Sequence, residues 1–150
     1  MRNPIYITNM CNVHVYGFMG DAGVGKSTVV TQLLHWYSTF ERIKMLRVHA
    51  DYGVDLSNII SAFEQKTVAD GTGTIPVVLV DNVTYHEDVS SIRTFSTNII
   101  VRVVRTDNGI SKVVPSREED ASDLSLFNAG NSIRDLSTLL YLSLPVPMYQ

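Results

Sequence analysis

The sequence predicts a three-layer α/β fold in which helices flank a mostly parallel sheet. Apolar segments of strand length alternate along the chain with segments whose apolar residues have helical spacing, which is typical of a parallel sheet covered on both faces. One such strand, residues 76–81, is continuously apolar up to its final aspartate, as expected for a strand buried on both sides. A glycine-rich turn, residues 20–25, links the first expected strand to the first expected helix.

The first half of the chain is expected to hold two strands, each followed by a helix. The helix expected at 26–40 has apolar residues at i, i+3, i+4 and i+7, and this spacing forms one apolar stripe. The same spacing recurs in a second helix that begins near Leu56, with Asp51 or Asp55 available to cap its amino end. The strands that precede these helices are expected at 12–19 and 44–50.

The second half continues the alternation and ends in a helix. A short helix is expected at 83–93, directly after the apolar strand 76–81. The turn sequence Asp107-Asn108-Gly109 favours a hairpin in which 110–114 returns as an antiparallel strand. The remaining expected elements are a strand at 98–105, a polar loop at 116–123 and a final helix at 132–144 that two prolines stop.

Composition indicates one globular domain over residues 1–150. Hydrophobic residues make up 45% of the chain, which at this length is enough to form a core. The net charge of −3 argues against non-specific binding to nucleic acid or to an anionic membrane, both of which favour a cationic surface. The single cysteine, Cys11, excludes an internal disulfide, and no apolar stretch approaches the roughly 20 residues of a membrane span. We therefore expect a soluble, cytoplasmic protein.

The chain carries one motif that is specific for phosphate binding. Residues 20–27 read Gly-Asp-Ala-Gly-Val-Gly-Lys-Ser and match G-x-x-x-x-G-K-[ST] in full, between an expected strand and an expected helix. In such a loop the glycines let backbone N–H groups turn toward phosphate oxygens, and the amino end of the helix adds a positive field. The expected fold is therefore that of the P-loop (Walker A) NTPases. The residues expected to bind the phosphates of ATP are Gly20, Asp21, Ala22, Gly23, Val24, Gly25, Lys26, Ser27 and Thr28.

The apolar strand 76–81 is expected to end beside this loop. Its last residue, Asp81, would then lie at the carboxyl edge of the sheet, where it can hold Mg²⁺ directly or through water. The hydroxyl of Ser27 would be a second metal ligand, and Lys26 would reach the β- and γ-phosphates. An aspartate after an apolar run can also cap a helix, but its place downstream of a P-loop favours the metal role. The four histidines show no metal-like spacing.

Several short segments follow the P-loop in a fixed order. They are His49-Ala50-Asp51, residues 81–88, Ile92-Arg93, residues 99–105, residues 123–130 and Asp135-Leu136. With the P-loop, these segments resemble the bacteriophage-type deoxynucleoside monophosphate kinases, in a shortened form. The resemblance implies a kinase that uses ATP and Mg²⁺ to phosphorylate a nucleoside or deoxynucleoside monophosphate. It also implies a phage or viral source, and hence the cytoplasm of the host.

Two arginines are candidates for the transferring phosphoryl group, since such a site needs positive charge. Arg102 and Arg105 are three apart on an expected strand, so they face opposite sides and at most one points at the site. Arg105 is the candidate because it lies at the carboxyl end of the strand, although a solvated strand-end charge is the alternative. A third arginine, Arg117 in the polar loop, either is a lid residue that binds the acceptor or is solvated.

Two further residues are candidates for binding the acceptor. Asp51 either contacts a substrate hydroxyl or caps the helix that begins near Leu56. Tyr85 either stacks on the acceptor base or packs in the core beside Val89. Thr84 departs from the resemblance, because the family usually has an arginine there that meets the monophosphate, and the acceptor and lid segments are short.

Three functions are therefore compared. The first is a nucleotide kinase with ATP, Mg²⁺ and a nucleoside monophosphate as its ligands. The second is an ATPase or switch module that acts on a protein or nucleic-acid partner, against which Asn82 counts, since such proteins often carry an acid there to activate water. The third is a degenerate, non-catalytic nucleotide-binding protein, which Thr84 and the short lid favour. The sequence gives no strong nucleic-acid signal and no membrane signal, and it leaves a homodimer open.

Overall fold

The residues that the structure describes form a sheet with five parallel strands in the order β2-β3-β1-β4-β6. The computed structural model describes residues 13–20, 25–51, 53–84, 86–107, 110–111 and 122–128. The parallel strands are β1 (His14–Met19), β2 (Ile43–His49), β3 (Ile75–Asp81), β4 (Thr97–Asp107) and β6 (Leu124–Asn128). A short strand, β5 (Ile110–Ser111), pairs antiparallel with the end of β4.

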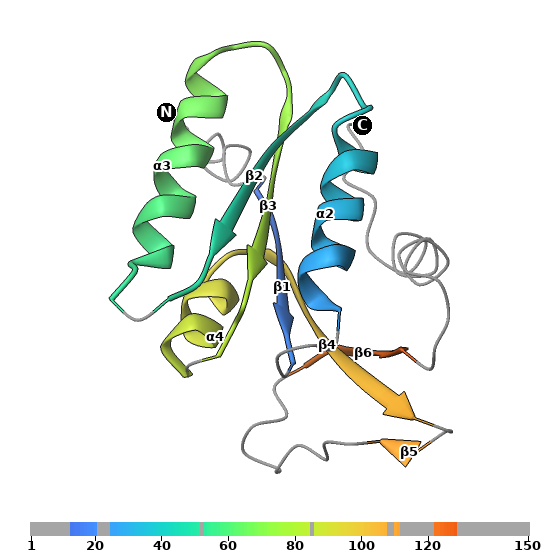
Figure 1. The fold of residues 1–150 in the computed structure, drawn as a ribbon. Helices are drawn as coiled ribbons and strands as arrows, with labels where there is room; N and C mark the ends of the chain where they lie inside the picture. Colours follow the sequence, from blue (N-terminus) through green and yellow to red (C-terminus); the bar gives the residue numbers. More distant parts are fainter. Residues whose placement is uncertain are drawn as a thin grey trace.

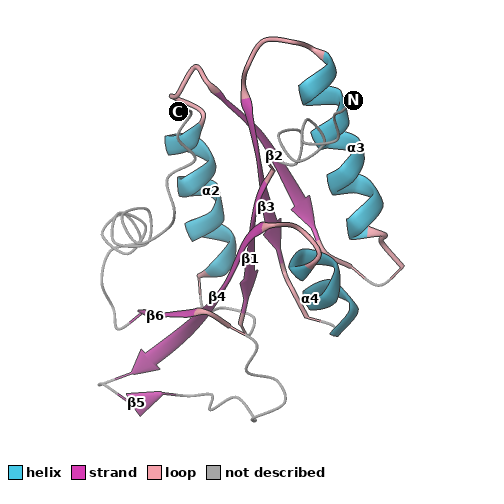
Figure 2. Cartoon of the chain, turned by 180° about the vertical axis from the view of Figure 1, so that it is seen from behind, coloured by secondary structure: helices cyan, strands magenta, loops and turns pink. Residues whose placement is uncertain are grey.

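Helices cover both faces of the sheet (Figure 1). On one face lies α2 (Lys26–Tyr37), and on the other lie α3 (Leu56–Ala69) and α4 (His86–Arg93), a layering that Figure 2 shows from behind. Two separate cores fill the layers, because alternate residues of a strand face opposite sides. Val77 and Leu79 of β3 pack with α2, whereas Val78 and Val80 pack with α3 and α4. The predicted three-layer α/β fold is confirmed. None of the described helices is long and apolar enough to cross a membrane.

Every residue of β3 is buried. The strand lies between β2 and β1 in the sheet and has helices over both faces, so an apolar sequence is needed along its whole length. The prediction of a fully covered strand from its continuous apolar run is therefore confirmed. The run ends in a carboxylate, Asp81, whose residue is 4% exposed and which lies where β3 reaches the edge of the sheet.

Of the two helices on the face opposite α2, α3 begins at Leu56 as expected, whereas α4 begins later than expected. Asp55 caps α3, since its side chain accepts a hydrogen bond from the Asn58 N–H at 3.2 Å, so the alternative that Asp51 caps this helix is wrong. α4 begins at His86 rather than at residue 83. The reason is that the N–H of Val83 donates to the Phe18 carbonyl at 2.9 Å and so remains tied to the sheet.

The carboxyl-terminal part of the sheet is the least predictable from the sequence. The sequence pattern does not indicate β6, a short strand whose Leu124 and Leu126 pack only partly against the α2 core. Of the expected return strand at 110–114, Ile110 and Ser111 pair antiparallel with β4. The expected final helix at 132–144 lies outside the described residues.

Candidate functional site

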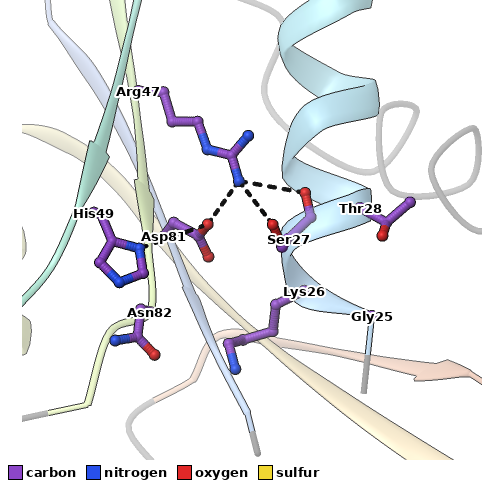
Figure 3. A pocket seen from close by; sticks show the side chains of 8 residues that line it. All are labelled: Gly25, Lys26, Ser27, Thr28, Arg47, His49, Asp81 and Asn82. Atoms are coloured by element: carbon purple, nitrogen blue, oxygen red, sulfur yellow. Dashed lines mark hydrogen bonds and ion pairs between the residues drawn. The ribbon is translucent and has the colours of Figure 1, made fainter. Parts of the chain in front are cut away.

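A pocket of about 710 Å³ opens where α2 begins and where β2 and β3 end (Figure 3). It forms there because parallel strands present their carboxyl ends together, beside the amino ends of the helices that follow them. β1 leads toward α2 and pairs with β3, and β3 pairs with β2, so these elements meet at one corner. The described residues that line the pocket are Gly25, Lys26, Ser27, Thr28, Arg47, His49, Asp81 and Asn82.

The amino end of α2 presents a positive field to this pocket. Gly25 is the N-cap of the helix at φ 101°, a left-handed conformation that glycine adopts without strain, and a glycine offers no side chain to cap it. The first turn has no acidic residue, so its N–H groups and the helix dipole are left for an anion. Lys26 adds a full charge, and its Nζ donates to the Gly20 carbonyl at 2.7 Å. Asp21, Ala22, Gly23 and Val24 lie outside the described residues, so the structure gives both ends of the predicted P-loop.

Ser27 and Asp81, the two expected metal ligands, lie beside one guanidinium nitrogen. Nη2 of Arg47 donates to Asp81 Oδ2 at 2.7 Å and to Ser27 Oγ at 3.1 Å (Figure 3). The Asp81 side chain is 6% exposed, whereas that of Arg47 is 29% exposed. A carboxylate this deeply buried needs a cation close by, and Arg47 supplies one. The structure thus brings Ser27 and Asp81 together at the pocket wall.

Arg47 is a pocket residue that the sequence reasoning missed. It lies in β2 opposite Leu79 of β3, which packs in the α2 core, so its side chain points to the α2 face. A second nitrogen, Nη1, donates to Thr31 Oγ1 at 2.7 Å, one helical turn beyond Ser27. The available signal was an arginine between the apolar residues Leu46 and Val48 of an expected strand. That signal does not say which strand lies next door, and therefore cannot name Asp81 as the partner.

His49 and Asn82 complete the described wall of the pocket. His49 lies opposite Asp81 in the register, with its Nδ1 4.0 Å from Asp81 Oδ2 and its side chain 64% exposed. Asn82 has a φ of 61°, a left-handed conformation that asparagine tolerates better than most residues. Its Nδ2 donates to the Ala50 carbonyl at 3.2 Å, which ties the end of β3 to the end of β2. A side-chain amide is not a base, so Asn82 cannot activate water as a carboxylate could.

The described part of the chain does not gather the residues expected to bind the acceptor. Asp51 is exposed just beyond β2 and is not among the described residues that line the pocket. Arg105 lies in β4 and pairs with Asn128 of β6, but its side chain is outside the described part, as are Tyr85 and Arg117. Thr84 belongs to the turn before α4. The acceptor site therefore stays a prediction.

Solved structures that share this fold include two that match most of the chain. The crystal structure of APE1195 is 14% identical over 89% of this chain and 95% of its own, with a TM-score of 0.54. A mutant of the APS kinase from Mycobacterium tuberculosis is 16% identical over 87% of this chain and 95% of its own, with a TM-score of 0.51. Identities this low establish the fold alone, which is α/β and like that of a P-loop kinase. No protein-family model and no curated protein sequence matches the chain.

Proposed function

We propose that this protein is a small nucleotide kinase that transfers the γ-phosphoryl group of ATP to a nucleoside or deoxynucleoside monophosphate. The observation that carries the proposal is the shared pocket that Lys26 and Ser27 line from the amino end of α2 and Asp81 lines from the end of β3. Phosphoryl transfer depends mainly on positioning and on neutralising the phosphate charge, so it needs few groups beyond these. A pocket that combines a positive field with oxygen atoms able to bind a metal ion supplies both.

The phosphates of ATP would bind against the amino end of α2. The N–H groups of its first turn would donate to phosphate oxygens, as the left-handed Gly25 allows the backbone to approach closely. Lys26 would exchange its hydrogen bond to the Gly20 carbonyl for one to a phosphate oxygen. The ammonium group is thus bonded before and after the exchange, and binding does not require an unpaired charge at any stage.

The oxygen donors at this corner fit a magnesium ion. Ser27 Oγ and Asp81 Oδ2 both lie within hydrogen-bonding distance of the same nitrogen, so a cation placed near that point can contact both. Among the described residues no three His, Cys, Asp or Glu side chains form a metal cluster, so phosphate and water oxygens would complete the shell. Bound Mg²⁺ would neutralise charge on the β- and γ-phosphates.

The acceptor class rests on two kinds of support. The fold is like that of a P-loop kinase, and the ordered segments after the P-loop resemble kinases of deoxynucleoside monophosphates. In this proposal Asp51, Tyr85 and Arg117 contact the acceptor, and Arg105 stands near the transferring group with Lys26. Asn82 disfavours the ATPase alternative, because a side-chain amide is not a base. This amide in addition donates to the Ala50 carbonyl.

A coupled ADP-release assay against the common ribo- and deoxyribonucleoside monophosphates tests the proposal. We expect turnover with at least one acceptor, and loss of that turnover in Lys26→Ala. If ATP binds but no acceptor is phosphorylated, the kinase proposal is wrong. Acceptor-independent hydrolysis that rises with a protein or nucleic acid would then favour the switch module, and its absence would favour a non-catalytic nucleotide-binding protein.

A further inference from the structure

The guanidinium of Arg47 lies beside both expected metal ligands, Ser27 and Asp81. Nη2 of Arg47 is 2.7 Å from Asp81 Oδ2, 3.1 Å from Ser27 Oγ and 3.4 Å from the Ser27 carbonyl oxygen. We propose that Arg47 occupies the magnesium position in the nucleotide-free protein, and that its guanidinium must be displaced before Mg²⁺ can bind. The inference rests on the proposed function only in assigning a metal ion to this corner.

Charge repulsion opposes the binding of both cations at this corner. Magnesium binds oxygen ligands at about 2.0–2.1 Å, which is closer than the 2.7 Å and 3.1 Å that separate Nη2 from these oxygens. An ion bound directly to Ser27 Oγ or Asp81 Oδ2 would therefore lie close to the guanidinium and be repelled by its positive charge. Arginine cannot give up its charge to make room for a metal ion, so movement of the side chain is the way to clear the position.

Arg47 is held by an ion pair and a hydrogen bond, and its side chain is still partly exposed to solvent. Asp81 is buried, and in the absence of a metal ion the guanidinium neutralises its charge. The Arg47 side chain is 29% exposed, and its Nη1 rests on the Thr31 hydroxyl of the exposed side of α2. Displacement would move this side chain further into solvent, away from Asp81. Asp81 would have a cationic partner in both states, and the apparent metal affinity would be reduced by the displacement of Arg47.

A metal titration tests this without measuring turnover. Free Mn²⁺, followed by electron paramagnetic resonance, is titrated into the full chain in the presence of a non-hydrolysable ATP analogue. Arg47→Met keeps the apolar stem of the side chain but removes its charge, and we expect it to bind Mn²⁺ about five- to tenfold more tightly than the wild type. Lys44→Met is the matched control, because Lys44 lies on the same strand, faces the other side and pairs with Asp70 at 2.9 Å. It should leave Mn²⁺ affinity unchanged.

A second variant covers the case in which Arg47→Met does not fold. Thr31→Ala removes the hydrogen bond from Nη1 and keeps the ion pair with Asp81, so it should tighten Mn²⁺ binding about twofold. Equal or weaker Mn²⁺ binding in the folded variants would overturn the inference. Binding of a fluorescent ATP analogue in EDTA is measured alongside. If the wild type does not bind the ATP analogue, the proposed function is contradicted. If it binds the analogue but the Arg47 and Thr31 variants have the same Mn²⁺ affinity as the wild type, only the role of Arg47 is contradicted.

Discussion

Two arginine–aspartate pairs in this protein have the same shortest N–O distance, 2.7 Å, and different surroundings. Arg47 uses one nitrogen for both Asp81 and Ser27, in the wall of a pocket. Arg93 contacts both oxygens of Asp123, and a backbone N–H, that of Ile100, also donates to Asp123 at 2.8 Å. The comparison shows that distance alone does not distinguish a pair in a pocket wall from a pair that joins a helix to the sheet.

What separates the pairs is the number of fixed donors on the carboxylate. The bidentate contact from Arg93 and the hydrogen bond from the Ile100 N–H hold Asp123 in place just before β6. Because Arg93 ends α4 and Ile100 lies in β4, these contacts join α4 and β6 to β4. Asp81 instead lies at the end of a buried strand beside the amino end of α2, where we propose that Mg²⁺ displaces Arg47. We therefore expect substitutions at the pocket to affect turnover, and substitutions at the β4–β6 edge to affect stability.

The largest expected effect is on turnover at the pocket. Lys26→Ala should lower kinase turnover by about 100-fold or more, because it removes a preorganised positive charge from the phosphate site. Steady-state assays with the acceptor found by screening would measure this. Lys44→Ala provides the control, and a Lys26→Ala enzyme within threefold of the wild type would show that this pocket is not where the phosphates bind.

Asp81→Asn should also lower Mg²⁺-dependent turnover by about 100-fold, since the amide keeps the shape and loses the charge that attracts the metal. The matched change at the other pair, Asp123→Asn, should leave turnover within about twofold of the wild type. Measuring both variants over a range of Mg²⁺ concentrations tests the contrast directly. Equal losses of turnover in the two variants would remove the distinction between the pairs.

Asp123→Ala should lower the free energy of unfolding by about 1–2 kcal/mol. Much of this loss comes from the Ile100 N–H, which loses its carboxylate partner, because the Asp123 side chain is 40% exposed and its ion pair is screened by solvent. Urea unfolding followed by circular dichroism would measure the change. No change in unfolding free energy would mean that Asp123 does not hold β6 in place.

The pH dependence of this stability follows from the pKa of Asp123. Burial by itself raises this pKa, but the hydrogen bonds from Arg93 and the Ile100 N–H outweigh burial, so the pKa lies below its ordinary value of 3.8. The stabilisation is therefore present above the unfolded pKa and is lost as the pH falls through the folded pKa. The difference in unfolding free energy between wild type and Asp123→Ala should be constant from pH 7 to roughly pH 5 and should shrink below roughly pH 4.

His14 provides an internal check on that measurement. Burial lowers its pKa below the ordinary 6.5, so the stability of the folded chain should decline as the pH falls below that value. This decline should appear equally in wild type and Asp123→Ala and cancel from their difference. A difference that already shrinks between pH 7 and pH 6 would contradict the assignment of the pH dependence to Asp123.

The smallest expected effect is that of Arg93→Lys. Lysine keeps the charge but cannot contact Asn98 and both oxygens of Asp123 at once, as the guanidinium does. The expected loss is about 0.5–1 kcal/mol, with no change in nucleotide affinity. Thermal unfolding of the variant and the wild type would detect it. A loss well above 2 kcal/mol would indicate that the Arg93–Asp123 pair stabilises more of the fold than the β4–β6 edge of the sheet.

The sequence predicted most strongly those features in which the responsible residues are neighbours in the chain. The central strand is recognisable because burial on both faces requires an unbroken apolar run, as in residues 76–81. The P-loop is recognisable because its glycines, Lys26 and Ser27 lie within eight consecutive residues. β6 was missed because a five-residue strand with partly buried Leu124 and Leu126 has too weak a pattern.

Contacts between distant segments came only with the folded chain. Arg47 is 20 residues from Ser27 and 34 from Asp81, and it reaches both because β3 lies between β2 and β1. Hydrophobic periodicity predicts which residues share a face of a strand, but it carries no information on which strands are neighbours. The local chemistry of phosphate binding could thus be predicted from consecutive residues, whereas the cation beside Asp81 depended on strand order and register.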